Sequence, residues 1–146
     1  MVWSQYFSSA AKYSREVEKS ALALPAKIEA YKKAMEADVY GGKTPEETLQ
    51  LFIDALKKGD VELASKYFAL DNDTARPDLS RLDNFKVMVK EDKLQGMIDL
   101  LLKAKPAGSS LEGYYGFYIR DENGELIADI DLVFNKYSGV WKIESL

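Results

Sequence analysis

The chain has 146 residues, of which 47% are apolar, so it can bury the core of one ordinary domain and is too short for two large ones. Its 20 basic and 24 acidic side chains give a net charge of −4, which argues against nonspecific binding to nucleic acid or to an anionic membrane surface. Histidine and cysteine are absent, which excludes a Cys/His zinc site, a cysteine nucleophile, a Ser-His-Asp triad and a disulfide framework. We expect no cofactor, and the chemistry left to the chain is that of carboxylates, tyrosines and lysines.

The N-terminal segment, residues 3–36, shows the spacing of an amphipathic helix, with apolar residues mostly three or four positions apart. Pro25 falls inside this pattern and cannot donate to a helical turn, so the helix is either kinked there or split into two, and we favour the split. We expect the stripe to pack against the rest of the chain; a partner coiled coil or a stalk is the alternative. The domain boundary is expected between residues 1–40 and 41–146. The stripe consists of Trp3, Tyr6, Ala10, Tyr13, Val17, Leu24, Ile28, Tyr31 and Met35.

The abrupt aromatic start, with Trp3, Tyr6 and Phe7, resembles a chain cut just after an anchor or leader. We therefore expect the full-length protein to be extracytoplasmic and membrane-tethered. No stretch of the sequence approaches the roughly 20 consecutive apolar residues that cross a bilayer, so these 146 residues are expected to be soluble, without direct membrane insertion.

Two helices with clear start signals are predicted after Gly42. Thr44 can cap the first, Pro45 costs no hydrogen bond at its first position, and Glu47 completes a capping box. Gly59 and Asp60 then end this helix and begin the next, because glycine tolerates a left-handed cap and aspartate is a good N-cap. The apolar faces are expected to be Leu49, Phe52, Ile53 and Leu56 in the first helix, and Leu63, Ala64, Tyr67 and Phe68 in the second.

The polar stretch from Asp71 to Asp78 suggests a calcium loop but lacks the glycine and the distal glutamate that such a loop needs, so we predict no metal site. Helical spacing returns over residues 79–104, with a break between two helices expected from Lys90 to Asp92; one long bent helix is the alternative. The segment 106–108 is expected to close the helical part. The apolar positions of this region are Leu79, Leu82, Phe85, Val89, Leu94, Met97, Ile98, Leu101 and Leu102.

Beyond Gly108 the apolar period changes from 3.6 to 2, which predicts strands over residues 113–121, 125–135 and 140–144. Asn123 and Gly124 are typical of a two-residue hairpin turn. With these two as the turn, the strands align in the register Phe117–Ile130, Tyr115–Leu132 and Ile119–Ala128, with Trp141, Ile143 and Phe134 on the same apolar face. The sequence therefore predicts an antiparallel sheet with one face in the core.

The other face of the predicted sheet is a candidate partner surface. Tyr114 and Tyr118 fall opposite Val133 and Asp129, and aromatic residues suit the centre of an interface. Homodimerisation or docking of a protein partner is expected there, although tyrosines also favour strands for their own packing. The candidate surface is Tyr114, Tyr118, Arg120, Asp129, Asp131 and Val133, with Lys142 and Glu144 completing a charged rim.

The order of elements, N-terminal helices followed by an antiparallel meander, is an α+β architecture. Two runs resemble the nuclear-transport-factor-2-like superfamily, and within it small bacterial domains with a lumazine-binding-like fold: GKTPEETLQLFIDALKKGDVELASKYFAL over residues 42–70 and GVWKIESL over residues 139–146. The resemblance covers residues 42–146 and implies a curved sheet wrapped as a cone over helices, often with a small pocket and often dimeric through the sheet. The chain departs from the family in showing three clear strands where more are usual, and in residues 1–40.

Three functions follow from these observations. The first is a non-catalytic structural or protein-interaction module. The second is a small-molecule binder with an apolar pocket between sheet and helices, lined by Phe52, Tyr67, Tyr115, Phe117 and Trp141. The third, an isomerase- or dehydratase-like enzyme such as the resemblance allows, lacks a base, because the register turns Asp129 and Asp131 away from the apolar side. We expect no catalytic residues.

Overall fold

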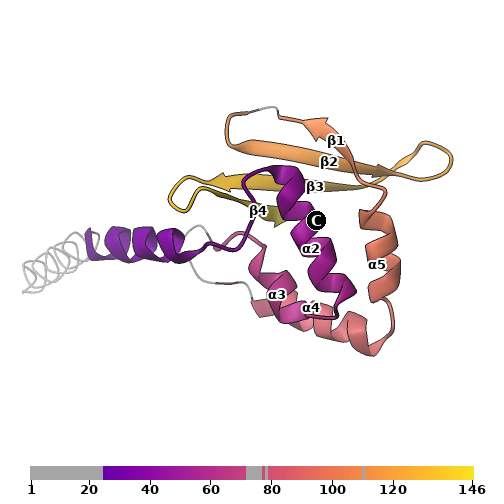
Figure 1. The fold of residues 1–146 in the computed structure, drawn as a ribbon, viewed down its shortest axis with the longest axis horizontal. Helices are drawn as coiled ribbons and strands as arrows, with labels where there is room; N and C mark the ends of the chain where they lie inside the picture. Colours follow the sequence, from indigo (N-terminus) through magenta and orange to yellow (C-terminus); the bar gives the residue numbers. More distant parts are fainter. Residues whose placement is uncertain (1–24, 72–76, 78, 110) are drawn as a thin grey trace, which may run out of the picture. The chain divides into compact units, whose positions relative to one another are not determined.

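The computed structural model describes residues 25–71, 77, 79–109 and 111–146 (Figure 1). Contacts divide the chain into two units, residues 1–34 and 35–146. A helix occupies residues 25–37 of the described part. The apolar stripe expected over residues 3–24 lies outside the described residues, as does most of the polar stretch 72–78.

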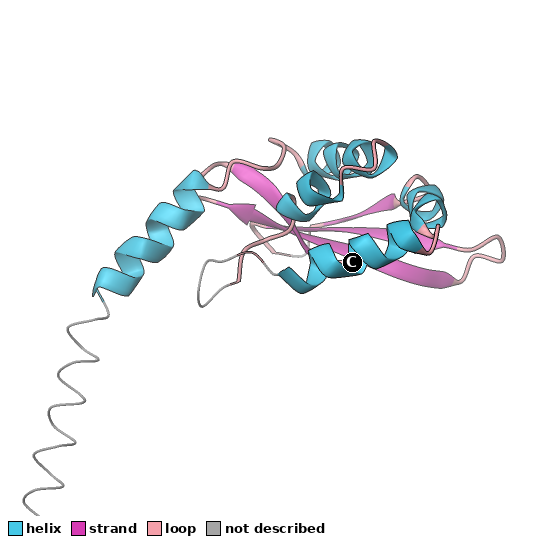
Figure 2. Ribbon diagram, turned by 90° about the horizontal axis from the view of Figure 1, so that it is seen from below, coloured by secondary structure: helices cyan, strands magenta, loops and turns pink. Residues whose placement is uncertain are grey.

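The second unit has the predicted α+β architecture, with helices first and a four-stranded antiparallel meander after them. Its helices α2–α5 lie on one side of the sheet (Figures 1 and 2). The strands are hydrogen-bonded in the order β1-β2-β3-β4. The elements are α2 (Pro45–Lys57), α3 (Val61–Lys66), α4 (Leu79–Lys90), α5 (Leu94–Leu101), β1 (Lys105–Gly108), β2 (Tyr114–Arg120), β3 (Leu126–Asn135) and β4 (Val140–Ser145).

Local signals place the helix ends as expected. The side chain of Thr44 accepts a hydrogen bond from the backbone N–H of Glu47, and Asp60 accepts one from Leu63 in the same way. One detail of the predicted capping box is wrong: the Glu47 carboxylate accepts from the N–H of Lys43, one residue before the cap.

The expectation of three strands is wrong, because Lys105–Gly108 forms β1 and does not simply close the helical part. Lys105 lies opposite Tyr118, and Pro106 lies opposite Phe117. Pro106 lacks an N–H and is tolerated because β1 is the edge strand of the sheet.

The predicted register of β2 and β3 is confirmed, with Phe117 opposite Ile130. The predicted two-residue turn is wrong, since Asp121 still pairs with Glu125 through its N–H. The connection is a three-residue loop in which Gly124 takes a φ of 81°, a left-handed conformation that favours glycine. A bulge between Ile119 and Arg120 compensates for the changed loop length, which explains why the rest of the register holds.

The core fills the space between the sheet and the helices. Phe52, Ile130, Leu132 and Ile143 are fully buried there, and the Phe52 ring meets Phe68 edge to face with centroids 5.4 Å apart. The apolar face expected for residues 79–89 is wrong in part. Leu79 and Val89 of α4 are exposed, and Phe85 is the buried residue of that helix.

The outer edge of β4 is closed by two segments from the first half of the chain. The N–H of Trp141 donates to the carbonyl of Gly42, and the N–H of Ile143 donates to the carbonyl of Tyr67. Thr48 of α2 is fully buried at this edge; its hydroxyl donates to the carbonyl of Trp141 and accepts from the N–H of Gly42. One hydroxyl therefore joins a helix, a strand and a connecting segment.

Replacing this hydroxyl by a methyl group, Thr48→Val, should destabilise the domain by about 1–3 kcal/mol, because two buried backbone groups lose their partner while the side-chain shape is kept. The measurement is chemical unfolding of both proteins. Thr44→Val, at the solvent-exposed cap of the same helix, is the matched control and should cost about 0.5–2 kcal/mol. A Thr48→Val variant as stable as the wild type would contradict the role of this hydroxyl.

Candidate functional site

The residues predicted for the partner surface lie together on the face of the sheet opposite to the buried side chains of Phe117, Ile130 and Leu132. We call this face the outer surface and define it by Tyr114, Gly116, Tyr118, Arg120, Asp129, Asp131 and Val133. The register sets Tyr114 opposite Val133 and Tyr118 opposite Asp129, as expected. The Tyr114 side chain is 43% exposed.

A hollow of about 520 Å³ opens on this face where two glycines meet. Gly108 and Gly116 are cross-strand partners without side chains, and one of the nearest side chains to a Cβ at Gly116 would be the small Ala107, 3.8 Å away. Asp131 lies opposite Gly116 on the next strand, and Asp131 and Glu144 are the two carboxylates in the lining. The hydroxyl of Ser145 donates to Asp131 Oδ2 at 2.9 Å. This first hollow is therefore acidic.

A second hollow, of about 410 Å³, lies on the same sheet near the β2–β3 turn and is mainly basic. Lys103, Lys105 and Arg120 line it together with Tyr118, and the Arg120 guanidinium lies 5.1 Å from the centre of the Tyr118 ring. Two acidic residues, Asp121 and Glu122, are also in the lining, so basic side chains outnumber acidic ones there by three to two. Asp121 Oδ1 accepts two backbone N–H groups of the turn.

The residues predicted to line an internal ligand pocket separate into two groups. Phe52, Tyr67 and Phe117 are buried in the core. Tyr115 and Trp141 are half-buried, with ring centres 6.4 Å apart, at the part of the sheet beside the start of α2.

The hydroxyl groups of two tyrosines in this set have raised pKa values. Burial raises the pKa of Tyr115, and the Glu46 carboxylate raises it further through a hydrogen bond and its charge. Burial also raises the pKa of Tyr67, with smaller effects from Asp54 and Asp60. Both phenols are therefore neutral donors at physiological pH and cannot act as bases there.

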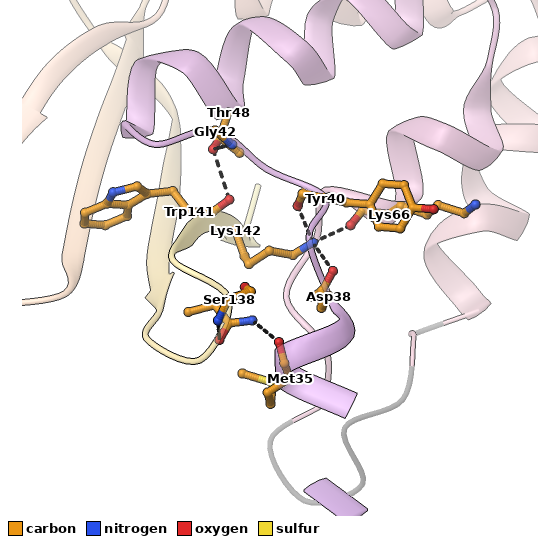
Figure 3. A network of polar contacts seen from close by, with 10 residues as sticks. Met35, Asp38, Tyr40, Gly42, Thr48, Lys66, Ser138, Trp141 and Lys142 are labelled. Carbon is orange, nitrogen blue, oxygen red and sulfur yellow. Dashed lines mark hydrogen bonds and ion pairs between the residues drawn. The ribbon is translucent and has the colours of Figure 1, made fainter. Parts of the chain in front are cut away.

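Lys142 was expected on the solvated rim of the outer surface, and this expectation is wrong. The side chain is 1% exposed and ends among three acceptors: Asp38 Oδ1 at 2.9 Å, the carbonyl of Tyr40 at 2.6 Å and the carbonyl of Lys66 (Figure 3). The pleat does turn Lys142 away from Trp141 and Ile143, as predicted. The segment 38–42 covers it.

This polar network continues into the β3–β4 turn. Asn135 is buried; its amide donates to the carbonyl of Met35 at 2.9 Å, and its oxygen accepts from the N–H of Tyr137. Asp38 Oδ2 and the hydroxyl of Ser138 are buried without a hydrogen-bond partner among the described residues. Buried polar atoms of this kind are ordinarily satisfied by internal water.

Sequence reasoning missed the roles of Asp38 and Asn135 and misplaced Lys142. The one local signal is a lysine between Trp141 and Ile143, in a strand whose other central residues are apolar. A Cβ at Gly41 would lie 2.2 Å from the carbonyl oxygen of Trp141. The close crossing of these two segments therefore requires glycine at residue 41.

Comparison of the chain with protein-family models, with curated proteins and with solved structures gives no match. Among the described residues, no group of three or more acidic side chains is placed to hold a metal ion. No helix in the described ranges combines the length and the apolar character that crossing a membrane requires.

Burial lowers the pKa of Lys142 below its ordinary value of 10.5, and the opposing effect of Asp38 is smaller. The unfolded chain therefore holds this proton more tightly than the folded one, so the lysine's contribution to the unfolding free energy increases as pH rises from the lowered pKa to about 10.5. Urea unfolding of the wild type and of Lys142→Met across that range isolates the effect. The wild-type value minus the variant value should increase with pH, whereas a constant difference would show that burial does not perturb the ammonium group.

Proposed function

We propose that this chain is a non-catalytic protein-interaction module that pairs with a second copy of itself through the outer surface. The observation that carries the proposal is Gly116, in the middle of β2. Its φ is not in the left-handed region, and a Cβ there would meet its nearest neighbours at an unstrained 3.8 Å. Neither conformation nor crowding requires glycine, and glycine weakens a strand, so its presence is best explained by the close approach of another chain.

Charge favours a second copy as the occupant. The acidic hollow holds Asp131 and the basic hollow holds Arg120, and both open on one face. In a two-fold dimer with its axis between the hollows, each acidic hollow faces the partner's basic one, so the same pair of contacts forms twice. Tyr114 and Val133 supply the apolar contact area beside them.

The sheet edges favour docking through the face. β1 is four residues long and contains Pro106 and Lys105, three features that discourage addition of a further strand. The β4 edge is occupied by hydrogen bonds from the segments around Gly42 and Tyr67. The broad surface left to a partner is therefore the outer one.

The alternative of a small-molecule pocket between sheet and helices has weaker support. Phe52 and Phe117 fill that space as members of one core cluster, and the Phe52 ring lies within 6 Å of two further phenylalanine rings. The α+β architecture agrees with the resemblance to the nuclear-transport-factor-2-like superfamily, but no further feature of the fold bears on it. Membership of that superfamily therefore remains part of the proposal.

Reciprocal charge reversal tests the pairing. Arg120→Asp alone and Asp131→Arg alone should each weaken self-association at least about tenfold, because each places like charges together twice in a homodimer. An equimolar mixture of the two variants should associate as well as the wild type, since every contact in the mixed dimer again joins opposite charges. Sedimentation equilibrium measures all three.

The matched control is the pair Lys86→Asp and Asp83→Arg on the exposed side of α4, which should leave association unchanged both alone and mixed. A wild type that sediments as a monomer, or single variants that self-associate like the wild type, would overturn the proposed function.

Filling the acidic hollow gives an independent prediction, because it should stabilise the monomer and weaken self-association. Gly116→Val should raise the unfolding free energy of the monomer by about 0.5–1 kcal/mol, because valine suits a strand better than glycine. The same change should weaken self-association, because its side chain occupies the space of the partner. Thermal unfolding at low concentration and sedimentation at high concentration measure the two effects; a variant that gains stability and associates normally would remove Gly116 from the interface.

A further inference from the structure

We propose that residues 38–42 form a strap that gates the outer surface by withholding the Lys142 ammonium group from it; this inference rests on the proposed function and assigns its regulation. When the strap is closed, Lys142 is buried beneath it. When the strap opens, Lys142 adds a positive charge to the docking face and weakens pairing with a second copy.

The register places Lys142 directly in that face. Tyr114, Val133 and Lys142 are successive cross-strand partners, so they form one row across β2, β3 and β4. Two of the three belong to the outer surface. Asp131, whose carboxylate is proposed to receive the partner's Arg120, lies two residues from Val133 on the same side of β3. The strap therefore covers the end of a row that the interface uses.

The strap is attached mainly by polar contacts. Lys142 Nζ donates to Asp38 Oδ1 and to the carbonyl of Tyr40, and the N–H of Trp141 donates to the carbonyl of Gly42 (Figure 3). The apolar residues of the strap contribute little burial, since Val39 is 62% exposed and Tyr40 is 39% exposed. The part of the strap from Asp38 to Tyr40 is therefore held by the ammonium group, whereas Gly42 is held separately by Trp141 and Thr48.

Such an attachment has two states. A buried ammonium group without its acceptors is strongly unfavourable, so Lys142 is either fully coordinated or hydrated. The buried ion pair itself adds little net stability, because desolvation offsets most of the attraction between Lys142 and Asp38. Opening is thus a local event that leaves the core intact.

Opening changes the charge of the interface. A hydrated Lys142 lies beside Val133 and two positions from Asp131, where it competes with the partner's Arg120 for the acidic hollow. Closed chains therefore pair more tightly than open ones, and by linkage pairing must favour the closed strap to the same degree.

Two variants separate the opening of the strap from the exposure of the Lys142 ammonium group. Asp38→Asn removes the counter-charge and should open the strap with Lys142 present, which weakens self-association about fivefold or more. Lys142→Met should open the strap without adding a cation, and should associate like the wild type. Hydrogen exchange at residues 38–42 should become faster in both variants, while the amides of Ile130 and Leu132 stay protected.

Acylation of lysine amines, mapped by mass spectrometry, reports the strap without reference to pairing. Lys142 should resist acylation in the wild type and react in Asp38→Asn, whereas Lys86, on the exposed face of α4, should react in both. The wild type also supplies a test that needs no variant: the slow acylation of Lys142 should become slower as protein concentration rises, because pairing favours the closed strap.

The outcomes distinguish the two proposals. A monomeric wild type in which Lys142 still reacts only after Asp38→Asn would defeat the proposed function and with it the gating, while leaving the strap. A wild type that pairs, with Asp38→Asn reactive at Lys142 but equally tight, would defeat the gating alone. Acylation of Lys142 at the rate of Lys86 in the wild type would defeat the strap itself.

Discussion

One buried ammonium group joins the last strand of the sheet to two segments from the first half of the chain. Lys142 lies in the last strand, yet its three acceptors come from the segment before α2 and from the end of α3. These contacts hold the segment before α2 and the end of α3 against the edge of β4. A lysine performs this task because its three donors suit three acceptors that approach from different directions, and because its long stem carries the charge out of the plane of the sheet.

Features that depend on neighbouring residues could be predicted from the sequence. The Thr44 and Asp60 caps act over three residues, and the β2–β3 register follows from apolar alternation on both sides of a short loop. The loop itself was predicted wrongly, because Asn123 and Gly124 fit both a two-residue turn and the last positions of a three-residue loop. A bulge restores the alternation that the core demands, so burial determines the register more strongly than the turn does.

Features that depend on distant residues could not be predicted. Alternation correctly placed Lys142 on the outer side of the sheet, but its burial depends on Asp38, 104 positions away. The strand β1 was missed because Pro106 and Gly108 in a four-residue segment indicate a loop by every local rule. The candidate surface shows the same division. Its residues could be predicted from strand spacing, whereas the acidic hollow depends on the pairing of Gly108 in β1 with Gly116 in β2, which no local pattern indicates.

The arrangement of charge on the outer surface bears on orientation more than on strength. Exposed charge pairs add little to affinity, and the hollows are open to water, so in the proposed dimer the contact area of Tyr114 and Val133 has to supply most of the attraction. Opposite charges in the two hollows instead exclude the wrong alignments of two similar faces, because a parallel arrangement would bring Asp131 against Asp131. A cation introduced beside Val133 disturbs this selection directly. Under the proposed pairing, the burial of Lys142 serves the surface as well as the fold, because it keeps a long, flexible charge away from a face whose specificity depends on where each charge lies.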